Sequence, residues 1–235
     1  MPVACVIPAR YGSTRFPGKL LAKAKGKTIL QRTFERVAAC PFLSDISVAT
    51  DDERIAEHAR EFGARVIWTS ASCQNGTERI AEAVVNDPIL QKASILLNAQ
   101  GDHPAIALET IRAVVEALRA DPGASMSTAV CASKEGLSSP HRVKCVFDQQ
   151  GNALYFSRAP IPYTGVKYLH VGIYAYRPEA LVLLKNHPST PLQIAEDLEQ
   201  LKVLELGYRI KVAIVSEVPI GIDTPEDLQL FESIL

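Results

Sequence analysis

Residues 3–19 read Val3-Ala4-Cys5-Val6-Ile7-Pro8-Ala9-Arg10-Tyr11-Gly12-Ser13-Thr14-Arg15-Phe16-Pro17-Gly18-Lys19. The first five residues are apolar and partly β-branched, which is typical of a buried parallel strand. The next twelve include two glycines, two prolines and three cations, which are Arg10, Arg15 and Lys19. Small residues let backbone N–H groups approach a phosphate, and the cations add charge-assisted donors. We therefore expect a strand followed by a loop that binds an anionic ligand.

This loop is not a Walker A motif. Five residues separate Gly12 from Gly18-Lys19 where that motif has four, and Leu20 stands where its Ser or Thr metal ligand would be. The alternative interpretation is a basic surface turn between a strand and a helix. The three cations and the Pro-Gly-Lys ending favour the ligand-binding loop.

Composition limits the classes of protein that the chain can belong to. Its 235 residues suffice for one large α/β domain, and 47% apolar with 22% charged residues is ordinary for a globular protein. A formal net charge of −1 argues against a nucleic-acid binder, which usually carries a basic excess. Any cationic site must therefore be a local concentration of charge.

The cysteines and the N-terminus indicate the compartment. The five cysteines are scattered and show no metal-ligand spacing, so we expect free thiols in a reducing environment. The chain enters a strand at once, without the cationic and apolar regions of a signal peptide, and no apolar run has membrane-spanning length. These features predict a cytoplasmic, soluble protein.

The first half of the chain alternates strand and helix patterns. Beyond the opening strand, we expect strands over 46–49, 66–68 and 94–98 and helices over 28–39 and 77–85. Between the strands at 46–49 and 66–68 we expect another helix, which Thr50 and Glu53 open as a capping box and which Gly63 ends. This rhythm predicts a parallel sheet covered by helices on both faces.

The pattern of the second half predicts an insertion of antiparallel strands, after which the chain contributes again to the core of the first half. We expect strands over 127–131, 142–147, 153–156 and 167–176, a helix over 191–206, a strand over 210–215 and a closing helix over 224–235. The strands at 142–147 and 153–156 flank a hairpin-type loop. The predicted division is one domain with a core formed by 1–125 and 208–235 and an insertion at 126–207.

Two aspartates follow strand patterns, where ligands of open α/β sheets bind. Asp102 comes after the strand at 94–98, and helix initiation with Pro104 is its alternative role. Asp223 is not needed for capping, because Thr224 and Asp227 already form a capping box. Two carboxylates beside a cationic phosphate loop suit Mg²⁺, which binds a few carboxylates together with substrate phosphates.

Two further features are less decisive. The polar loop 72–79 leads to a helix N-terminus whose amides suit a base or a sugar. Arg158 ends an inserted strand and is equally a solvated charge or a carboxylate clamp. The histidines do not form a zinc set.

Taken together, these motifs resemble one family along the whole chain. Besides the opening loop, the sequence contains in order Ala49-Thr50-Asp51-Asp52, Asn75-Gly76-Thr77-Glu78-Arg79, Asn98-Ala99-Gln100-Gly101-Asp102, Ala153-Leu154-Tyr155-Phe156-Ser157-Arg158, His170-Val171-Gly172-Ile173-Tyr174-Ala175-Tyr176, Leu198-Glu199-Gln200-Leu201 and Asp223-Thr224-Pro225-Glu226-Asp227-Leu228. The chain resembles the 3-deoxy-manno-octulosonate (Kdo) cytidylyltransferases. It departs from their pattern at His103, which replaces an acidic residue, at Leu20, which replaces a proline, and in a short loop after Pro162.

The resemblance implies a Rossmann-like nucleotidyltransferase fold and the reaction of CTP with Kdo, in the presence of Mg²⁺, to give CMP-Kdo and pyrophosphate for lipopolysaccharide inner-core synthesis. It also implies a homodimer formed largely through the inserted region, with neither nucleic acid nor membrane as a partner. The implied catalytic residues are Arg10, Lys19, Asp102 and Asp223, of which the two aspartates ligate Mg²⁺. The implied CTP-binding residues are Ala9, Arg10, Arg15, Lys19, Asn75, Gly76 and Gln100. The implied sugar-binding residues are Arg79, Gln100, Arg158, His170, Tyr174, Glu199 and Gln200.

Three other functions stay open at this point. The acid sugar could be a relative of Kdo, such as an amino-Kdo or a sialic acid. A glycosyltransferase that consumes a nucleotide sugar would use a similar scaffold but would release a nucleoside phosphate instead of pyrophosphate. A non-catalytic nucleotide sensor is less consistent with the presence of both Lys19 and Asp102.

Overall fold

The computed structural model describes residues 2–13, 15–73 and 75–235. Its backbone contacts divide the chain into two compact units. The first comprises Met1–Leu108 and Pro219–Leu235, and the second comprises Glu109–Val218. The predicted division at 125/126 and 207/208 follows the strand and helix patterns of the sequence and stays a prediction. The two units are described in turn.

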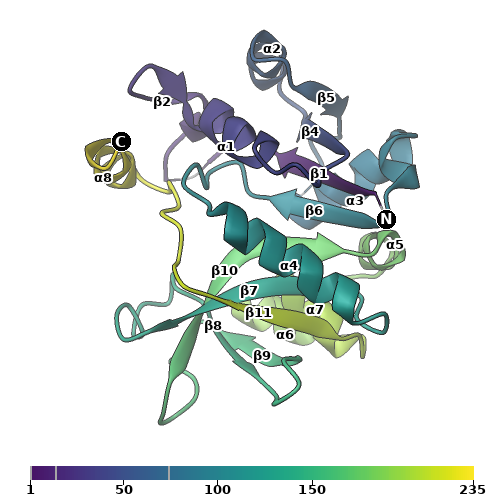
Figure 1. Cartoon of the computed structure of the whole chain (residues 1–235), viewed down its shortest axis with the longest axis vertical. Coiled ribbons are helices and arrows are strands. Elements are labelled where there is room, and N and C mark those ends of the chain that lie inside the picture. Colours follow the sequence, from purple (N-terminus) through teal and green to yellow (C-terminus); the bar gives the residue numbers. More distant parts are fainter. Residues whose placement is uncertain (1, 14, 74) are drawn as a thin grey trace. The chain divides into compact units, whose positions relative to one another are not determined.

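The first unit contains four parallel strands in the order β6–β1–β4–β5 (Figure 1). Their bounds are Val3–Pro8 for β1, Asp45–Thr50 for β4, Arg65–Trp68 for β5 and Ile95–Ala99 for β6. In the register of the sheet, Cys5 lies opposite Ile46 on one side and Leu97 on the other. All five residues of β6, and all of β1 except Pro8, are buried, as expected for a parallel sheet covered on both faces. The predicted parallel core is confirmed.

The helices of the first unit follow their strands at the expected places. They are α1 (Ile29–Ala38), α2 (Glu53–Glu61), α3 (Gly76–Asn86) and the C-terminal α8 (Pro225–Ser233), with short 3₁₀ turns at Lys19–Leu21 and Leu90–Lys92 and a small hairpin of β2 (Lys23–Ala24) and β3 (Lys27–Thr28). Helix α1 contacts β4, and α3 contacts β1 and β4. Figure 1 draws α1 in front of the strands and α3 fainter behind them. Strands β4 and β5 thus each pass through a loop into the N-terminus of a helix, α2 and α3 respectively.

One helix start differs from the prediction. Asp52, not Thr50, caps α2, because its Oδ1 accepts a hydrogen bond from the N–H of Arg54 at 3.0 Å. Thr50 is the last residue of β4, and its hydroxyl accepts a bond from the N–H of Asp52 instead. At α8 the predicted capping box of Thr224 and Asp227 is confirmed.

The second unit holds the inserted strands. Strand β7 (Met126–Ser133) pairs in parallel with β11 (Ile210–Val215) and antiparallel with β10 (Lys167–Tyr176). Strands β8 (Lys144–Phe147) and β9 (Ala153–Ser157) form the predicted hairpin, and β8 also pairs with β10. In the hairpin loop, the Asp148 carboxylate accepts bonds from two backbone N–H groups, and Gly151 adopts φ 76°.

Two helices of this region were not predicted. Helix α4 (Leu108–Ala120) buries Ile111, Val114, Val115 and Leu118, which have helical spacing, and the Val114 carbonyl accepts a bond from the Ser127 hydroxyl of β7. Helix α5 (Pro178–Asn186) begins with a proline at its first position. Both helices could have been found from these signals.

The predicted single helix over 191–206 is wrong. The segment forms two short helices, α6 (Pro191–Glu196) and α7 (Gln200–Glu205), with Asp197 between them in the left-handed region at φ 51°. The backbone carbonyls of Glu196 and Asp197 accept bonds from the guanidinium of Arg158, at 2.7 Å and 3.0 Å. In a continuous helix those carbonyls would instead accept from N–H groups four residues later. A distant arginine thus helps to end the first helix.

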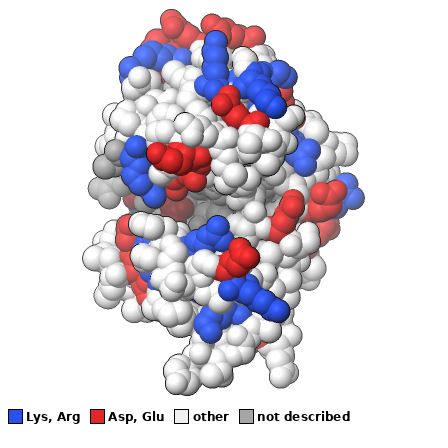
Figure 2. Space-filling view, turned by 90° about the vertical axis from the view of Figure 1, so that its left-hand side faces the viewer, with Lys and Arg blue, Asp and Glu red and all other residues white. Residues whose placement is uncertain are grey.

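The surface and the thiols agree with the composition. On the face drawn in Figure 2, basic and acidic side chains are interspersed, without one large patch of a single sign. All five cysteines are free thiols, as predicted; Cys73 is half-buried and the other four are buried. Among the described residues, no helix is both long and apolar enough to cross a bilayer.

Candidate functional site

The basic loop leaves the carboxyl end of β1 and is held by a small number of backbone contacts. The N–H of Ala9 donates to the carbonyl of Ala49 in β4 at 2.8 Å, which fixes the start of the loop. At its other end, Gly18 has φ 70°, a conformation that favours glycine, and its N–H donates to the Tyr11 carbonyl at 3.0 Å. Thr14 lies outside the described residues. Lys19 follows directly on Gly18.

The structure brings Lys19 and both predicted aspartates together. The Lys19 ammonium lies 2.5 Å from Asp102 Oδ2 and 2.9 Å from Asp223 Oδ1. Arg15 reaches the other oxygen of Asp223 at 2.9 Å. Asp102 and Asp223 are far apart in sequence, and their segments are joined where the N–H of Ile222 donates to the Asp102 carbonyl. The four charged side chains form one cluster, here called the ammonium–carboxylate cluster.

The positive and negative side chains of this cluster stabilise each other's charged forms. Burial disfavours the charged form of Lys19, but the neighbouring Asp102 and Asp223 carboxylates outweigh it and raise the pKa of the ammonium. Burial also acts against the charge of Asp223, yet its bond to Lys19 and the charge of Arg15 lower the pKa of that carboxyl. Lys19 and Asp223 are therefore both charged near neutral pH.

Asp102 is not the start of a helix. It lies in a turn, and the next helix, α4, begins only at Leu108. The side chain of Asp102 is consequently available for the cluster. His103, at the position where the sequence departs from the family pattern, places its Nε2 3.8 Å from the second oxygen of Asp102. The same ring lies so close to Gly221 that a Cβ there would be 3.1 Å from Nε2.

The two carboxylates fit a magnesium ion. One cation, the Lys19 ammonium, already lies within hydrogen-bond distance of both, so they converge on a point suited to positive charge. Among the described residues there is no group of three or more Asp, Glu, His or Cys side chains able to hold a metal. A Mg²⁺ ion held by Asp102 and Asp223 would take its other oxygen ligands from water and substrate phosphates, which is its usual preference.

A second part of the first unit surrounds the N-terminus of α3. Asn75 caps this helix by accepting a bond from the N–H of Glu78 at 2.9 Å. A Cβ on Gly76 would lie 3.6 Å from the amide nitrogens of both Asn98 and Gln100. The structure therefore brings Asn75, Gly76 and Gln100 together, and their binding of a nucleotide stays a prediction. Gln74 lies outside the described residues.

Asn98 is a residue to which the sequence analysis gave no role. Its side chain is fully buried at the end of β6, and neither its amide oxygen nor its amide nitrogen has a hydrogen-bond partner in the described part of the chain. Buried amides are normally bonded to protein, water or a ligand. The sequence signal that could have singled it out is an asparagine in an otherwise apolar strand.

Arg79 occupies a different environment from the one expected of a sugar-binding residue. It is buried, donates to the Thr69 hydroxyl at 2.5 Å and pairs with Asp51 at 3.0 Å. These contacts link α3 to the segments after β4 and β5. The geometry thus gives Arg79 a packing role within the first unit, and its predicted sugar contact stays a prediction.

In the second unit, three of the predicted sugar-binding residues form one group. The ring of His170 lies 5.4 Å from that of Tyr174, and the Tyr174 hydroxyl donates to the Gln200 amide oxygen at 3.4 Å. His170 also bonds to the Thr128 hydroxyl at 2.9 Å. Burial, and secondarily the charge of Glu199, raises the pKa of Tyr174 well above its ordinary value, so the phenol stays protonated. Gln200 is buried and its amide nitrogen has no partner among the described residues.

Arg158 lies in the same unit, but its guanidinium is occupied by protein groups. Besides the carbonyls of Glu196 and Asp197, it donates to the Pro140 carbonyl at 3.1 Å and to the Asp197 carboxylate at 3.3 Å. The Glu196 carboxylate in turn accepts from the N–H of Arg158 and from the Ser157 hydroxyl. Arg158 thereby connects β9 to the break between α6 and α7.

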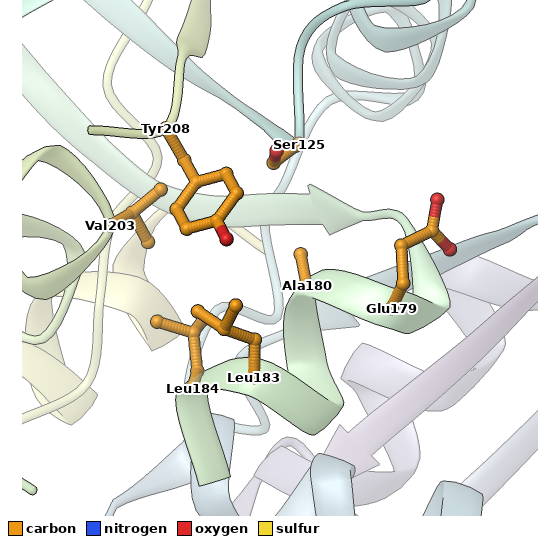
Figure 3. Close-up of a pocket in the computed structure, with 7 residues that line it drawn as sticks. All are labelled: Ser125, Glu179, Ala180, Leu183, Leu184, Val203 and Tyr208. Atoms are coloured by element: carbon orange, nitrogen blue, oxygen red, sulfur yellow. The ribbon is translucent and has the colours of Figure 1, made fainter. Parts of the chain in front are cut away.

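A cavity of about 130 Å³ in the second unit does not involve these residues. Figure 3 shows its lining, which is formed by Ser125, Glu179, Ala180, Leu183, Leu184, Val203 and Tyr208. None of the predicted site residues is among them. Pockets for small-molecule ligands usually measure about 300–1,000 Å³. This cavity is smaller than that, and we assign it no part in the site.

Comparisons with known proteins show the family to which the chain belongs. A model of the cytidylyltransferase family matches residues 4–210. The chain is 52% identical to a 3-deoxy-manno-octulosonate cytidylyltransferase of Protochlamydia amoebophila, covering 97% of this chain and 92% of the relative. It is 49% identical to the mitochondrial 3-deoxy-manno-octulosonate cytidylyltransferase of Arabidopsis thaliana, covering 99% and 83%.

A solved structure is similar along the entire chain. It is a CMP:2-keto-3-deoxy-manno-octonic acid synthetase complexed with CTP, 35% identical in sequence, with a TM-score of 0.94 over 100% of this chain and 98% of the other. This similarity confirms the predicted mixed α/β fold with a mostly parallel sheet. From the motifs, the fold and these relatives together, the chain belongs to the cytidylyltransferase family, among the 3-deoxy-manno-octulosonate cytidylyltransferases.

Proposed function

We propose that this protein transfers CMP from CTP to the anomeric hydroxyl of Kdo and releases pyrophosphate. The observation that carries the proposal is the ammonium–carboxylate cluster, in which Lys19 of the basic loop lies between Asp102 and Asp223. Cations for phosphate and carboxylates for a metal are thus assembled at one place. The relatives named above are cytidylyltransferases for this sugar, and 35–52% identity over nearly the whole chain supports the same substrates here.

In the proposed reaction, the anomeric oxygen of Kdo forms a bond to the α-phosphorus of CTP, and its hydroxyl proton is released to solvent. The bond between that phosphorus and the oxygen leading to the β-phosphate breaks, and pyrophosphate leaves. Catalysis of such transfers depends mainly on positioning and on neutralising charge. Lys19, Arg15 and the exposed Arg10 would bind the triphosphate. Their charge stabilises the negative charge that builds up on the leaving pyrophosphate.

Asp102 and Asp223 would hold Mg²⁺. When bound, this ion supplies further positive charge at the phosphates and acidifies an oxygen that contacts it. The proposed nucleoside-binding residues lie at the α3 N-terminus and at the start of the loop; they are Ala9, Asn75, Gly76 and Gln100. His170, Tyr174, Glu199, Gln200, Arg79 and Arg158 stay the proposed sugar-binding residues.

One assay tests the proposed function. Pyrophosphate release is measured with CTP or UTP and with Kdo, an amino-Kdo or a sialic acid, at fixed Mg²⁺, and a parallel reaction contains a nucleotide sugar in place of CTP. We expect release only with CTP and Kdo. Release with sialic acid or an amino-Kdo and not with Kdo would replace the sugar assignment. Consumption of a nucleotide sugar without pyrophosphate would indicate a glycosyltransferase.

Replacing Arg158 by alanine should have two separate effects. The apparent Michaelis constant for Kdo should rise, because the sugar carboxylate needs a cationic donor that CTP does not use. The free energy of unfolding should fall by about 1–3 kcal/mol, because the substitution leaves the carbonyls of Pro140, Glu196 and Asp197 without this donor. Steady-state kinetics and thermal unfolding measure the two effects.

The Arg158→Lys variant separates the role in Kdo binding from the role in stability, because lysine keeps the positive charge but lacks the planar set of donors that bonds the three carbonyls. CTP binding measured alone by calorimetry should be nearly unchanged in both variants. A loss of CTP affinity with an unchanged Kdo dependence would move Arg158 to the nucleotide side.

Two properties of the whole protein belong to the same proposal. A homodimer through the second unit is supported by large apolar side chains that this unit exposes, among them Leu154, Ile194 and Ile214. Light scattering should then give twice the chain mass, and a monomer would contradict it. A cytoplasmic location is supported by the free thiols. The Arabidopsis relative, by contrast, is a mitochondrial protein by name.

A further inference from the structure

Tyr11 lies in the middle of the basic loop and its ring contacts the far end of that loop. A Cβ built on Gly18 would be only 3.1 Å from two atoms of the Tyr11 side chain and 3.2 Å from a third. The Gly18 N–H also donates to the Tyr11 carbonyl. Tyr11 and Gly18 therefore contact each other through both backbone and side chain, and any Cβ at position 18 would be crowded against the ring and strained at φ 70°.

The same ring is contacted by a second element. The central carbon of the Arg54 guanidinium lies 3.3 Å from the centroid of the Tyr11 ring, which is a close cation–π contact. Arg54 itself is oriented by two bonds to Asp52, at 3.0 Å and 2.6 Å, and Asp52 caps α2. The contact with Arg54 thus holds the Tyr11 ring against α2, a helix that lies outside the loop.

The loop needs such a contact. Between Ala9 and Gly18 the described residues form neither helix nor strand. A segment without regular hydrogen bonding takes its conformation from the few contacts at its ends and within it. Because Lys19 follows Gly18 directly, the conformation at Gly18 determines where the Lys19 side chain begins. The ammonium must then span from that point to both Asp102 and Asp223.

We propose that Tyr11, held by Arg54, is a positioning residue for Lys19. It acts through Gly18 and has no contact of its own with the reacting groups. The inference rests on the proposed function, in which Lys19 binds the triphosphate. The alternative is that Tyr11 touches the nucleotide directly, and the experiment below is designed to tell the two apart.

Four single variants test the contact. Tyr11→Leu removes the aromatic ring, Tyr11→Phe keeps it, and Arg54→Gln removes the cation. Arg60→Gln is the matched control. Arg60 lies on the same helix as Arg54, its side chain is similarly exposed, and it forms an ion pair with Glu53. Hydrogen exchange of the peptides that cover residues 9–22, followed by mass spectrometry, reports the order of the loop without reference to activity.

We expect faster exchange of this segment in Tyr11→Leu and Arg54→Gln, and wild-type exchange in Tyr11→Phe and Arg60→Gln. Affinity for CTP, measured by calorimetry, should fall about tenfold in Tyr11→Leu and about three- to fivefold in Arg54→Gln, the size of a cation–π contact. Unchanged exchange in Tyr11→Leu, or an equal effect of Arg60→Gln, would overturn the proposal.

A double-variant cycle decides between positioning and direct contact. If Tyr11 acts through Lys19, Tyr11→Leu should cost no further CTP affinity in a protein that already carries Lys19→Ala. Full additivity of the two losses would instead mean that Tyr11 contacts the nucleotide itself, against the proposal. If the wild-type chain neither bound CTP nor released pyrophosphate, the proposed function would fail, while the exchange rates would still decide whether Tyr11 orders the loop.

Discussion

Asp102→Asn and Asp223→Asn should each lower turnover by about a hundredfold to a thousandfold, the rate equivalent of several kcal/mol of charge stabilisation by a metal. The amide keeps the shape of the carboxylate but removes the charge that Mg²⁺ prefers in its ligands. Both aspartates converge on one cation in the structure, so either loss weakens the same site. Pyrophosphate release across a magnesium titration measures the effect.

The control for these variants is Glu226→Gln, which removes an exposed carboxylate from the first turn of α8, close in sequence to Asp223. It should retain wild-type turnover. Circular dichroism should show all three variants folded. Normal turnover of either aspartate variant at low magnesium would refute the assignment of a metal to this pair.

Lys19→Ala should impair turnover strongly and weaken CTP binding. It removes the one ammonium that reaches both carboxylates, and it leaves Asp102 and Asp223 to repel each other and the triphosphate. Lys19→Arg should restore only part of the activity, because a planar guanidinium places its donors differently from a compact ammonium on a flexible stem. Steady-state kinetics and calorimetry with CTP measure both variants.

Lys23→Ala serves as the comparison, since Lys23 is an exposed lysine in the hairpin that follows the loop. It should behave like the wild type. If Lys19→Ala retained a near-native rate and CTP affinity, the basic loop would be a surface turn and the proposed role of the cluster would be lost.

The parts of the fold that follow from local pattern were predictable. The apolar runs at β1 and β6 and the caps at Thr28, Asn75 and Thr224 are each encoded within a few residues. Parallel strands bring their carboxyl ends to one edge, which is why the loop of Lys19 and Asp102 could be placed together from the sequence. Asp223 was expected to follow a strand as well, but residues 216–224 form neither helix nor strand, and Asp223 reaches the cluster from a loop.

Helices α4 and α5 were missed although their signals are local, whereas the break in the helix predicted over 191–206 depends on a contact from a distant segment. Nothing within 191–206 signals that the helix will break at Asp197. The carbonyls of Glu196 and Asp197 accept hydrogen bonds from Arg158, which lies much earlier in the sequence. The same bonds could not be foreseen for Arg158 itself, which as a strand-end arginine suggested either a solvated charge or a carboxylate clamp. An asparagine in the otherwise apolar strand β6 is a sequence signal for Asn98, but the lack of a partner for its buried amide among the described residues is visible only in three dimensions.

The ammonium–carboxylate cluster has a consequence for how charge is exchanged when substrate arrives. Without ligands, Lys19 and Arg15 neutralise Asp102 and Asp223, two positive charges against two negative ones. A single divalent cation carries the same charge as those two side chains together. The carboxylates can therefore pass from one counterion to the other with no net change, and Lys19 and Arg15 become available to the phosphates in the same event. In the proposed reaction, the metal replaces Lys19 and Arg15 at the carboxylates, and the triphosphate binds the two side chains that are released.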